Sequence, residues 1–112
     1  MNCTINIKPL SVNEAWQGRR FKTPKYKAYE EEFLYKLPPK LINKNKPLCL
    51  EIVVGFSNRA SDLSNIIKPL EDILCKKYGI DDRWNYKIIM TKKIVKKGLE
   101  YLTIDINDLD NL

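Results

Sequence analysis

The segment Leu48–Phe56 constrains the fold of this chain more than any other part of the sequence. Its residues, Leu-Cys-Leu-Glu-Ile-Val-Val-Gly-Phe, are rich in β-forming side chains and include a single charge, which favours a central strand. The next segment, Asp62–Tyr78, has apolar residues at helical spacing, and Gly79 is a natural stop for that helix. A strand followed by an amphipathic helix indicates a sheet with a helical layer on it.

Pro69 interrupts the helical pattern of this segment and leaves two interpretations open. Either the helix is kinked at Pro69, or residues 62–68 form an initial turn and the regular helix begins near Pro69. Further along, residues 86–95 and 99–106 are predicted strands, and the link at 96–98 is typical of a hairpin turn. The second half of the chain is therefore expected to be a helix followed by two strands.

The first part of the chain predicts a strand, a loop and a helix. Residues 2–8 alternate as a strand does, and residues 9–23 contain many turn formers and cations. Thr23 suits the N-cap of a helix and Pro24 its first turn. The apolar face of that helix comprises Ala28, Phe33, Leu34 and Leu37. The whole order, β-α-β-α-β-β, predicts an α+β fold in which two helices cover a small mixed sheet, as a single domain over residues 1–112.

Histidine is absent from the chain, and this absence narrows the chemistry available to it. Ser-His-Asp and Cys-His nucleophile systems, His-ligated zinc and His-dependent nuclease motifs are all excluded. Cys3, Cys49 and Cys75 are widely spaced, so we expect reduced thiols and neither a disulfide framework nor a zinc site. An enzymatic reaction would therefore depend on carboxylates, lysine and a bound metal.

The net charge of +6 lies in the N-terminal half of the chain. Residues 1–50 contain ten lysines and arginines against four glutamates, whereas residues 51–112 contain ten basic and ten acidic residues. A basic half beside a balanced half is typical of a protein with one binding surface for a polyanion such as nucleic acid. Apolar runs are far shorter than the about 20 residues that span a bilayer, and no basic-then-apolar leader opens the chain. We therefore expect a cytoplasmic protein without a membrane partner.

A group of polar residues after the central strand forms the candidate site. In helical geometry Ser64, Lys68 and Asp72 share one face, at i, i+4 and i+8. Asp62 lies at the strand-to-helix junction, and Asp82 lies in the loop that opens the next strand. Two acids from different elements that converge with a lysine would hold Mg²⁺ through oxygen ligands and leave positions open for a phosphate.

Each of these residues also has a plain structural interpretation. Asp62 would cap a helix, Asp81-Asp82 would be a polar turn, and Lys68 would be a solvated helix residue. Trp16 and Trp84 are expected in the core or in a dimer interface more than as platforms for stacked bases. Only the ordered set of residues favours a functional site.

That ordered set resembles the RusA family of Holliday-junction resolvases (crossover junction endodeoxyribonucleases). The family signature is Asp-x-Asp-Asn-x-x-Lys, an Asp on the same helix, and Asp-Asp at the start of a strand. Here the segments are Ser61-Asp-Leu-Ser-Asn-Ile-Ile-Lys68-Pro-Leu-Glu-Asp72 and Gly79-Ile-Asp-Asp82. Pro9-Leu-Ser-Val-Asn13 and Gly18-Arg-Arg-Phe-Lys-Thr23 are similar to the family's N-terminal motif and basic loop. The resemblance covers nearly the whole chain, in the right order.

The resemblance assigns roles to individual residues. Asp62 and Asp82 match metal-binding aspartates and Lys68 matches the catalytic lysine, so these are the expected catalytic residues. Ser64 departs from the pattern, because it stands where the family has a second aspartate, and a neutral ligand removes negative charge from the site. Further candidate metal ligands are Ser64, Asp72 and Asp81. The expected DNA contacts are Asn13, Arg19, Arg20, Lys22, Lys25, Lys27 and Asn65.

The activity that the resemblance implies is Mg²⁺-dependent cleavage of four-way (Holliday) DNA junctions by paired symmetric nicks, with Mn²⁺ as an expected substitute for Mg²⁺. Two nicks related by a two-fold axis need two sites, which implies a homodimer on branched DNA. Two alternatives stay open. One is a junction-binding protein that Ser64 has deprived of catalysis, and the other is a generic small basic nucleic-acid-binding protein without preference for a junction.

Overall fold

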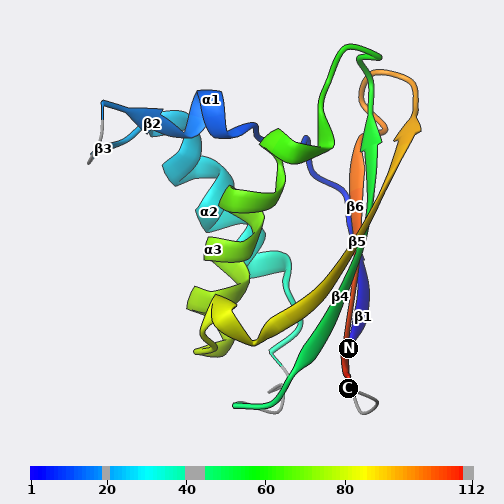
Figure 1. Cartoon of the computed structure of the whole chain (residues 1–112). Coiled ribbons are helices and arrows are strands. Elements are labelled where there is room, and N and C mark those ends of the chain that lie inside the picture. Colours follow the sequence, from blue (N-terminus) through cyan, green and yellow to red (C-terminus); the bar gives the residue numbers. More distant parts are fainter. Residues whose placement is uncertain (19–20, 40–44, 110–112) are drawn as a thin grey trace.

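Two long helices lie on one face of a four-stranded sheet in the computed structural model (Figure 1). The structure describes residues 1–18, 21–39 and 45–109. In this view the sheet is seen nearly edge-on, and both long helices lie on the same side of it (Figure 1). No helix in the described ranges is long and apolar enough to cross a membrane. The predicted α+β fold with a mixed sheet covered by helices is confirmed.

The sheet has the strand order β1-β6-β4-β5. β4 (Leu48–Phe56) has the predicted bounds and lies inside the sheet, parallel to β5 (Asn85–Ile94) and antiparallel to β6 (Tyr101–Asp108). β1 (Asn2–Ile5) pairs antiparallel with the other side of β6. Within the described residues, β1 and β5 are therefore the two edge strands of this sheet.

Local sequence signals fix the start of one long helix and the end of the other. α2 (Pro24–Lys36) begins after Thr23, whose hydroxyl oxygen accepts a 3.1 Å hydrogen bond from the backbone N–H of Tyr26, which confirms the predicted N-cap. α3 (Ile67–Tyr78) ends at Gly79, whose φ of 64° is a left-handed conformation that glycine adopts without strain. Both ends therefore follow from residues that can be read in the sequence.

The start of α3 decides between the two interpretations of Pro69. A 3-10 turn, η1 (Leu63–Asn65), precedes α3, which begins at Ile67, so Pro69 lies in the first turn of the helix. N–H groups in a first turn have no partner within their helix, so the N–H that proline lacks is not missed there. The interpretation with an initial turn is correct, and the helix begins slightly earlier than it predicts.

The loop predicted over residues 9–23 contains short elements. A helical turn, α1 (Val12–Ala15), is followed by a small hairpin of β2 (Trp16–Gln17) and β3 (Phe21–Lys22). Elements this short leave no periodicity to recognise in a sequence. The predicted first strand is also too long, because β1 ends at Ile5. Ile5 pairs with Leu102, and β6 begins only one residue before that, at Tyr101.

The hydrophobic core lies between the sheet and the two long helices. The inner strands bury alternate residues, which are Leu48, Leu50, Ile52, Val54, Leu102, Ile104 and Ile106. α2 buries Tyr26, Tyr29 and Phe33, whereas Ala28, predicted on the apolar face, is exposed. Aromatic rings bury far more surface than a methyl group, so the tyrosines determine which face of α2 is inside.

β5 and β6 do not form the predicted hairpin, because β4 lies between them. Lys96–Gly98 does lie in a turn, in which the N–H of Leu99 donates to the carbonyl oxygen of Lys96 over 2.9 Å. The link that contains this turn passes the end of β4 (Figure 1). β6 buries every second residue and fits an inner position, whereas β5 is largely exposed on both faces and fits an edge.

Candidate active site

Lys68 contacts two carboxylates that belong to different elements. Its ammonium nitrogen lies 3.0 Å from an oxygen of Asp72, one turn further along α3, and 3.8 Å from an oxygen of Asp82. Asp82 begins the 3-10 turn η2 (Asp82–Trp84), which connects α3 to β5. The hydrogen bond to Asp72 is the main cause that raises the pKa of Lys68 above its ordinary value, and the charge of Asp82 adds to it. Lys68 is therefore a firmly protonated cation beside two carboxylates.

The turn after α3 brings Asp82 back toward Lys68. The N–H of Gly79 donates to the carbonyl oxygen of Cys75 over 2.8 Å, and the chain then reverses. Asp81 caps η2, because its carboxylate accepts a 3.0 Å hydrogen bond from the N–H of Arg83. Asp81 thus serves the turn, and its neighbour Asp82 provides the carboxylate beside Lys68.

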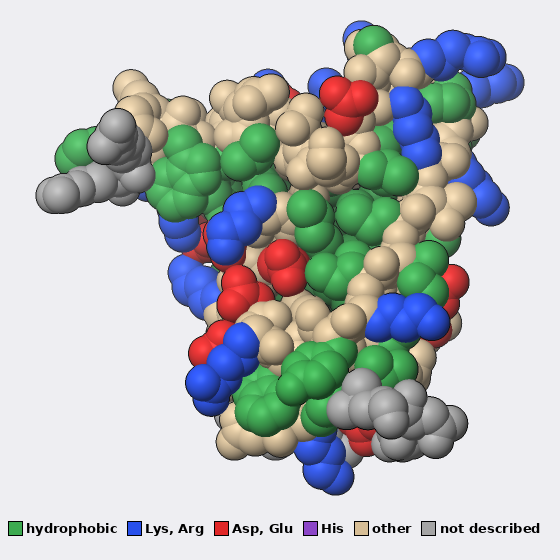
Figure 2. Space-filling model, viewed as in Figure 1, with side chains coloured by type: hydrophobic (Ala, Val, Ile, Leu, Met, Phe, Trp, Pro, Cys, Tyr) green, Lys and Arg blue, Asp and Glu red, His purple; other side chains and the backbone are tan. Residues whose placement is uncertain are grey.

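This cluster is open to solvent. The side chains of Lys68, Asp72 and Asp82 are 55%, 35% and 49% exposed. Figure 2 shows acidic and basic side chains gathered over α3, beside a hydrophobic band. Ion pairs this exposed contribute little to stability and exchange partners readily. A phosphate or a cation can therefore reach these groups without opening the core.

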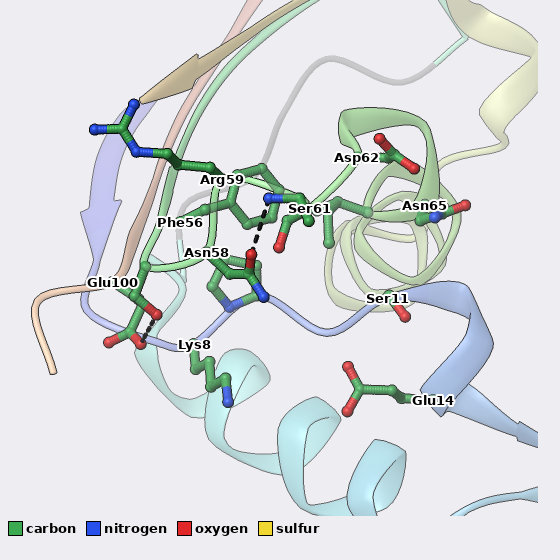
Figure 3. A pocket seen from close by; sticks show the side chains of 14 residues that line it. Lys8, Ser11, Glu14, Phe56, Asn58, Arg59, Ser61, Asp62, Asn65 and Glu100 are labelled. Carbon is green, nitrogen blue, oxygen red and sulfur yellow. Dashed lines mark hydrogen bonds between the residues drawn. The ribbon is translucent and has the colours of Figure 1, made fainter. Parts of the chain in front are cut away.

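Asp62 lies in a separate place, at a pocket of about 840 Å³ (Figure 3). One wall is the turn 57–61 after β4, and the opposite wall carries Lys8 and Glu14 (Figure 3). Asn65, predicted to contact DNA, also lines the pocket. Asp62 and Lys68 are therefore on neighbouring elements, but only Asp62 faces this pocket.

The Asp62 carboxylate has no hydrogen-bond or ion-pair partner within the described part of the chain, and it does not cap η1. The other acids of the pocket are engaged. Glu14 pairs with Lys25, which holds the pKa of Glu14 below its ordinary value, and Glu100 accepts a 2.8 Å hydrogen bond from the hydroxyl of Ser57. Asp62 is thus the pocket carboxylate that is free to bind a ligand.

A lysine on β5 fastens the turn that leads to Asp62. The ammonium group of Lys92 donates to the carbonyl oxygens of Arg59, at 2.7 Å, and Ser61, at 2.5 Å. Within the turn, the side-chain oxygen of Asn58 accepts a 2.8 Å hydrogen bond from the N–H of Ala60. These bonds hold one wall of the pocket in place.

Besides Asn65, which lines the pocket, the predicted DNA contacts fall into three groups. Asn13 and Lys27 are exposed and available to a phosphate. Lys22 is paired with Glu30 at 2.7 Å, and Lys25 is paired with Glu14, so both would have to exchange partners on binding. Arg19 and Arg20 lie outside the described residues.

The donor set suits Mg²⁺ in kind, since this ion prefers oxygen ligands and often takes only one or two carboxylates, with water and substrate phosphate completing the shell. Asp72 and Asp82 offer such a pair beside Lys68, and Asp62 offers a third, separate carboxylate. Ser64 is exposed in η1 and adds a neutral oxygen. Among the described residues, no three acidic or cysteine side chains are grouped closely enough to hold a metal by themselves.

Lys8, Arg59 and Lys92 are functional candidates that the sequence did not reveal. Lys8 and Arg59 line the pocket with Asp62, and Lys92 braces its wall. A polar turn directly after a buried strand was the available signal for Arg59, since such turns often carry binding residues. Nothing in the sequence distinguishes Lys92 from its neighbouring lysine.

Comparisons with known proteins do not assign a function to this site. No protein-family model matches the chain, and no curated protein matches it.

Proposed function

We propose that the chain is a Mg²⁺-dependent, structure-selective endodeoxyribonuclease that resolves four-way DNA junctions by paired nicks, one from each of two copies. The proximity of Lys68 to Asp82 carries this proposal, since their side chains lie 3.8 Å apart although a helix separates them in sequence. Both are residues for which the resemblance to the RusA family predicts a catalytic role. An exposed lysine beside carboxylates also suits phosphoryl chemistry, which relies on positioning and on charge.

The chemistry would be hydrolysis of a phosphodiester. A water attacks phosphorus, one P–O bond breaks, and the departing sugar oxygen takes a proton. Asp72 and Asp82, which lie beside Lys68, would hold Mg²⁺, which when bound polarises the phosphate and acidifies a coordinated water. Lys68 would stabilise the negative charge on the phosphate oxygens or on the departing oxygen. Lys8 and Arg59, at the pocket, would bind neighbouring phosphates.

A second candidate is a junction-binding protein without catalysis. It is favoured by Ser64, which stands where the resemblance predicts a carboxylate, and by the lack of a three-acid group among the described residues. With fewer fixed carboxylates, Mg²⁺ would be held more weakly. DNA binding through cations does not require the metal and would persist.

Cleavage of a labelled, mobile four-way junction tests the proposal, with linear duplex of the same sequence beside it. We expect symmetric nicks in the junction only, and only with Mg²⁺ or Mn²⁺. Selective binding of the junction without product under either metal would support the second candidate. Equal binding of junction and duplex would contradict both and leave a generic basic nucleic-acid-binding protein.

Matched variants identify the residues responsible. We expect Asp82→Asn and Lys68→Ala to abolish cleavage, because one removes a metal ligand and the other a cation. Asp105→Asn, on the uncovered face of the sheet, and Lys97→Ala, in the exposed link before β6, should cleave as the unchanged protein does. Ser64→Asp separates the candidates, since cleavage that appears only in this variant would show that the native chain binds without cutting.

A further inference from the structure

β5 exposes more large apolar side chains than any other described element. Tyr86, Ile88, Ile89 and Ile94 are 55%, 40%, 37% and 43% exposed. A hydrophobic band runs down the middle of the face in Figure 2, where Figure 1 places β5. Several large apolar side chains exposed along one element of a folded protein are typical of an interaction site.

β5 also has a free backbone edge. It runs from Asn85 to Ile94 and pairs only with β4, so its second edge has no partner in the described part of the chain. The other edge strand, β1, is only four residues long. A long edge with unpaired N–H and C=O groups is a template for another strand.

The apolar side chains of β5 extend the core past the helices. The parallel register places Ile88 beside Leu50 and Ile94 beside Phe56, both of which are buried on the helix side of the sheet. Side chains of paired residues point to the same face, so Ile88 and Ile94 belong to the core layer although they are partly exposed. Ile89 points to the other face. A partner strand on this edge would cover apolar side chains on both faces.

We infer that β5 is the surface on which a second copy of this chain docks, by antiparallel pairing of the two β5 strands about a two-fold axis at Thr91. The resulting sheet would be continuous through both copies, with all long helices on one face. An isologous contact needs a surface that complements itself, and an antiparallel strand pair meets that condition. The inference rests on the proposed function in one respect, which is that paired nicks need two active sites joined in a dimer. The association itself is measured without DNA.

The lysines of β5 disfavour a two-fold axis at Met90, and its exposed isoleucines favour one at Thr91. A two-fold axis at Met90 would set Lys87 directly opposite Lys93 of the other copy, and like charges in opposed positions are destabilising. An axis at Thr91 sets Lys87 opposite Val95 and Lys93 opposite Ile89. It also pairs Ile88 with Ile94, which buries the two side chains that the helices leave uncovered. Lys92 is already bonded to backbone carbonyls and does not compete for the edge.

Charge between the copies gives the dimer a diagnostic response to salt. Each copy carries a net charge of +6, so the two repel, and salt weakens that repulsion while leaving the apolar contact in place. Association should therefore strengthen as salt rises. DNA binding should weaken over the same range, because salt competes with lysine for phosphates.

Sedimentation equilibrium of the DNA-free chain, over a series of concentrations and at low and moderate salt, tests the association. We expect the mass to approach twice that of one chain, at lower concentration in the higher salt. A mass of one chain under every condition overturns the inference.

Disulfide trapping tests the surface and the register together. Across an antiparallel pair, opposed Cα atoms lie about 4.5–5.5 Å apart, within the range that a disulfide spans. We expect Thr91→Cys to give a crosslinked dimer on mild oxidation, with the bond mapped to position 91 by mass spectrometry. Thr4→Cys, an exposed threonine on the other edge strand, and the unchanged chain with its native cysteines should stay uncrosslinked. Crosslinking of Thr4→Cys in place of Thr91→Cys overturns the inference.

These results are separable from the nuclease assay. If Thr91→Cys gives a crosslinked dimer but the protein never cuts a junction, the inferred interface stands and the proposed nuclease activity is wrong. If the protein cuts junctions but Thr91→Cys gives no crosslinked dimer, the proposed nuclease activity stands and the inferred interface is wrong.

Discussion

The ammonium nitrogen of Lys92 lies 2.5 Å from the carbonyl oxygen of Ser61. The same group donates to the carbonyl oxygen of Arg59 and lies 5.7 Å from the centre of the Phe56 ring. Lys92 therefore joins the edge strand β5 to the turn that precedes Asp62, and its charge is satisfied by backbone dipoles and a ring.

Replacing this lysine should loosen the turn. We expect Lys92→Met to lower the free energy of unfolding by about 1–3 kcal/mol, because hydrogen bonds from a charged donor are lost while the apolar stem is kept. Hydrogen exchange should quicken at the amide of Ser61. Lys93→Met, one position along and exposed, is the control and should change stability by less than about 0.5 kcal/mol. Equal losses in the two variants would show that the carbonyl contacts contribute nothing.

Glu30 should make stability depend on pH in the acid range. Its side chain, only 12% exposed, accepts hydrogen bonds from Lys22 and Lys76, both at 2.7 Å. Burial raises the pKa of Glu30, but these two hydrogen bonds outweigh it and hold the pKa below the ordinary 4.5. The contribution to stability is therefore complete above pH 4.5 and is lost as the pH falls through the lowered pKa.

Near neutral pH we expect Glu30→Gln to lower the free energy of unfolding by about 1–3 kcal/mol, measured by denaturant titration. The two proteins should converge well below pH 4.5, where Glu30 is itself protonated. Glu31→Gln, one residue along α2 and exposed, provides the comparison. A stability difference that persists unchanged into acid would contradict this explanation.

Position 55 favours glycine because the ring of Tyr101 occupies the space that a side chain would need. The two residues are opposite each other in β4 and β6, and a Cβ atom added to Gly55 would overlap the Tyr101 ring. We expect Gly55→Ala to lower the free energy of unfolding by about 1–3 kcal/mol through overpacking. Adding Tyr101→Ala should be less harmful in the Gly55→Ala background than in the unchanged chain, as a double-mutant cycle would measure. Strict additivity would mean that the ring moves aside freely.

Cys75 should react slowly with alkylating reagents. Burial is the main cause that raises its pKa from 9.0 to about 11, and the nearby carboxylates, Asp82 first, add to the shift. The thiolate is the reactive form, so near pH 8 its fraction should be about 100-fold below that of an ordinary cysteine. Mass spectrometry of iodoacetamide-treated protein should show modification of Cys75 that keeps rising until about pH 11. A plateau by pH 9 would exclude the raised pKa.

The elements with their own capping residues were predictable, and the arrangement of strands was not. Thr23 and Gly79 fix helix ends through local hydrogen bonds, so they act in any tertiary setting. No local sequence signal indicates that β6 pairs with β4 and β1. The strand order depends on which strand buries more of its residues in the folded sheet. The tight turn at 96–98 was misleading for that reason.

The candidate site was predictable to a similar extent. Helical spacing places Lys68 beside Asp72, and a short turn returns Asp82 to the same helix. Ser64, which was predicted to share a helix face with Lys68 and Asp72, lies in η1 and not in the regular helix, and Asp62, directly before η1, lines a separate pocket. The brace at Lys92 was hidden because it joins segments that meet only after folding.

The position of β6 between β1 and β4 has a consequence for synthesis on the ribosome. β1 is made early, but its sheet partner consists of residues 101–108, so it waits until these emerge. Until then β4 has one neighbour in place of two, and the apolar side chains that β6 will cover are open to chaperones and proteases. A chain cut short before residue 101 should therefore be degraded, because two of the three strand pairings in the sheet, β1 with β6 and β4 with β6, would be lost.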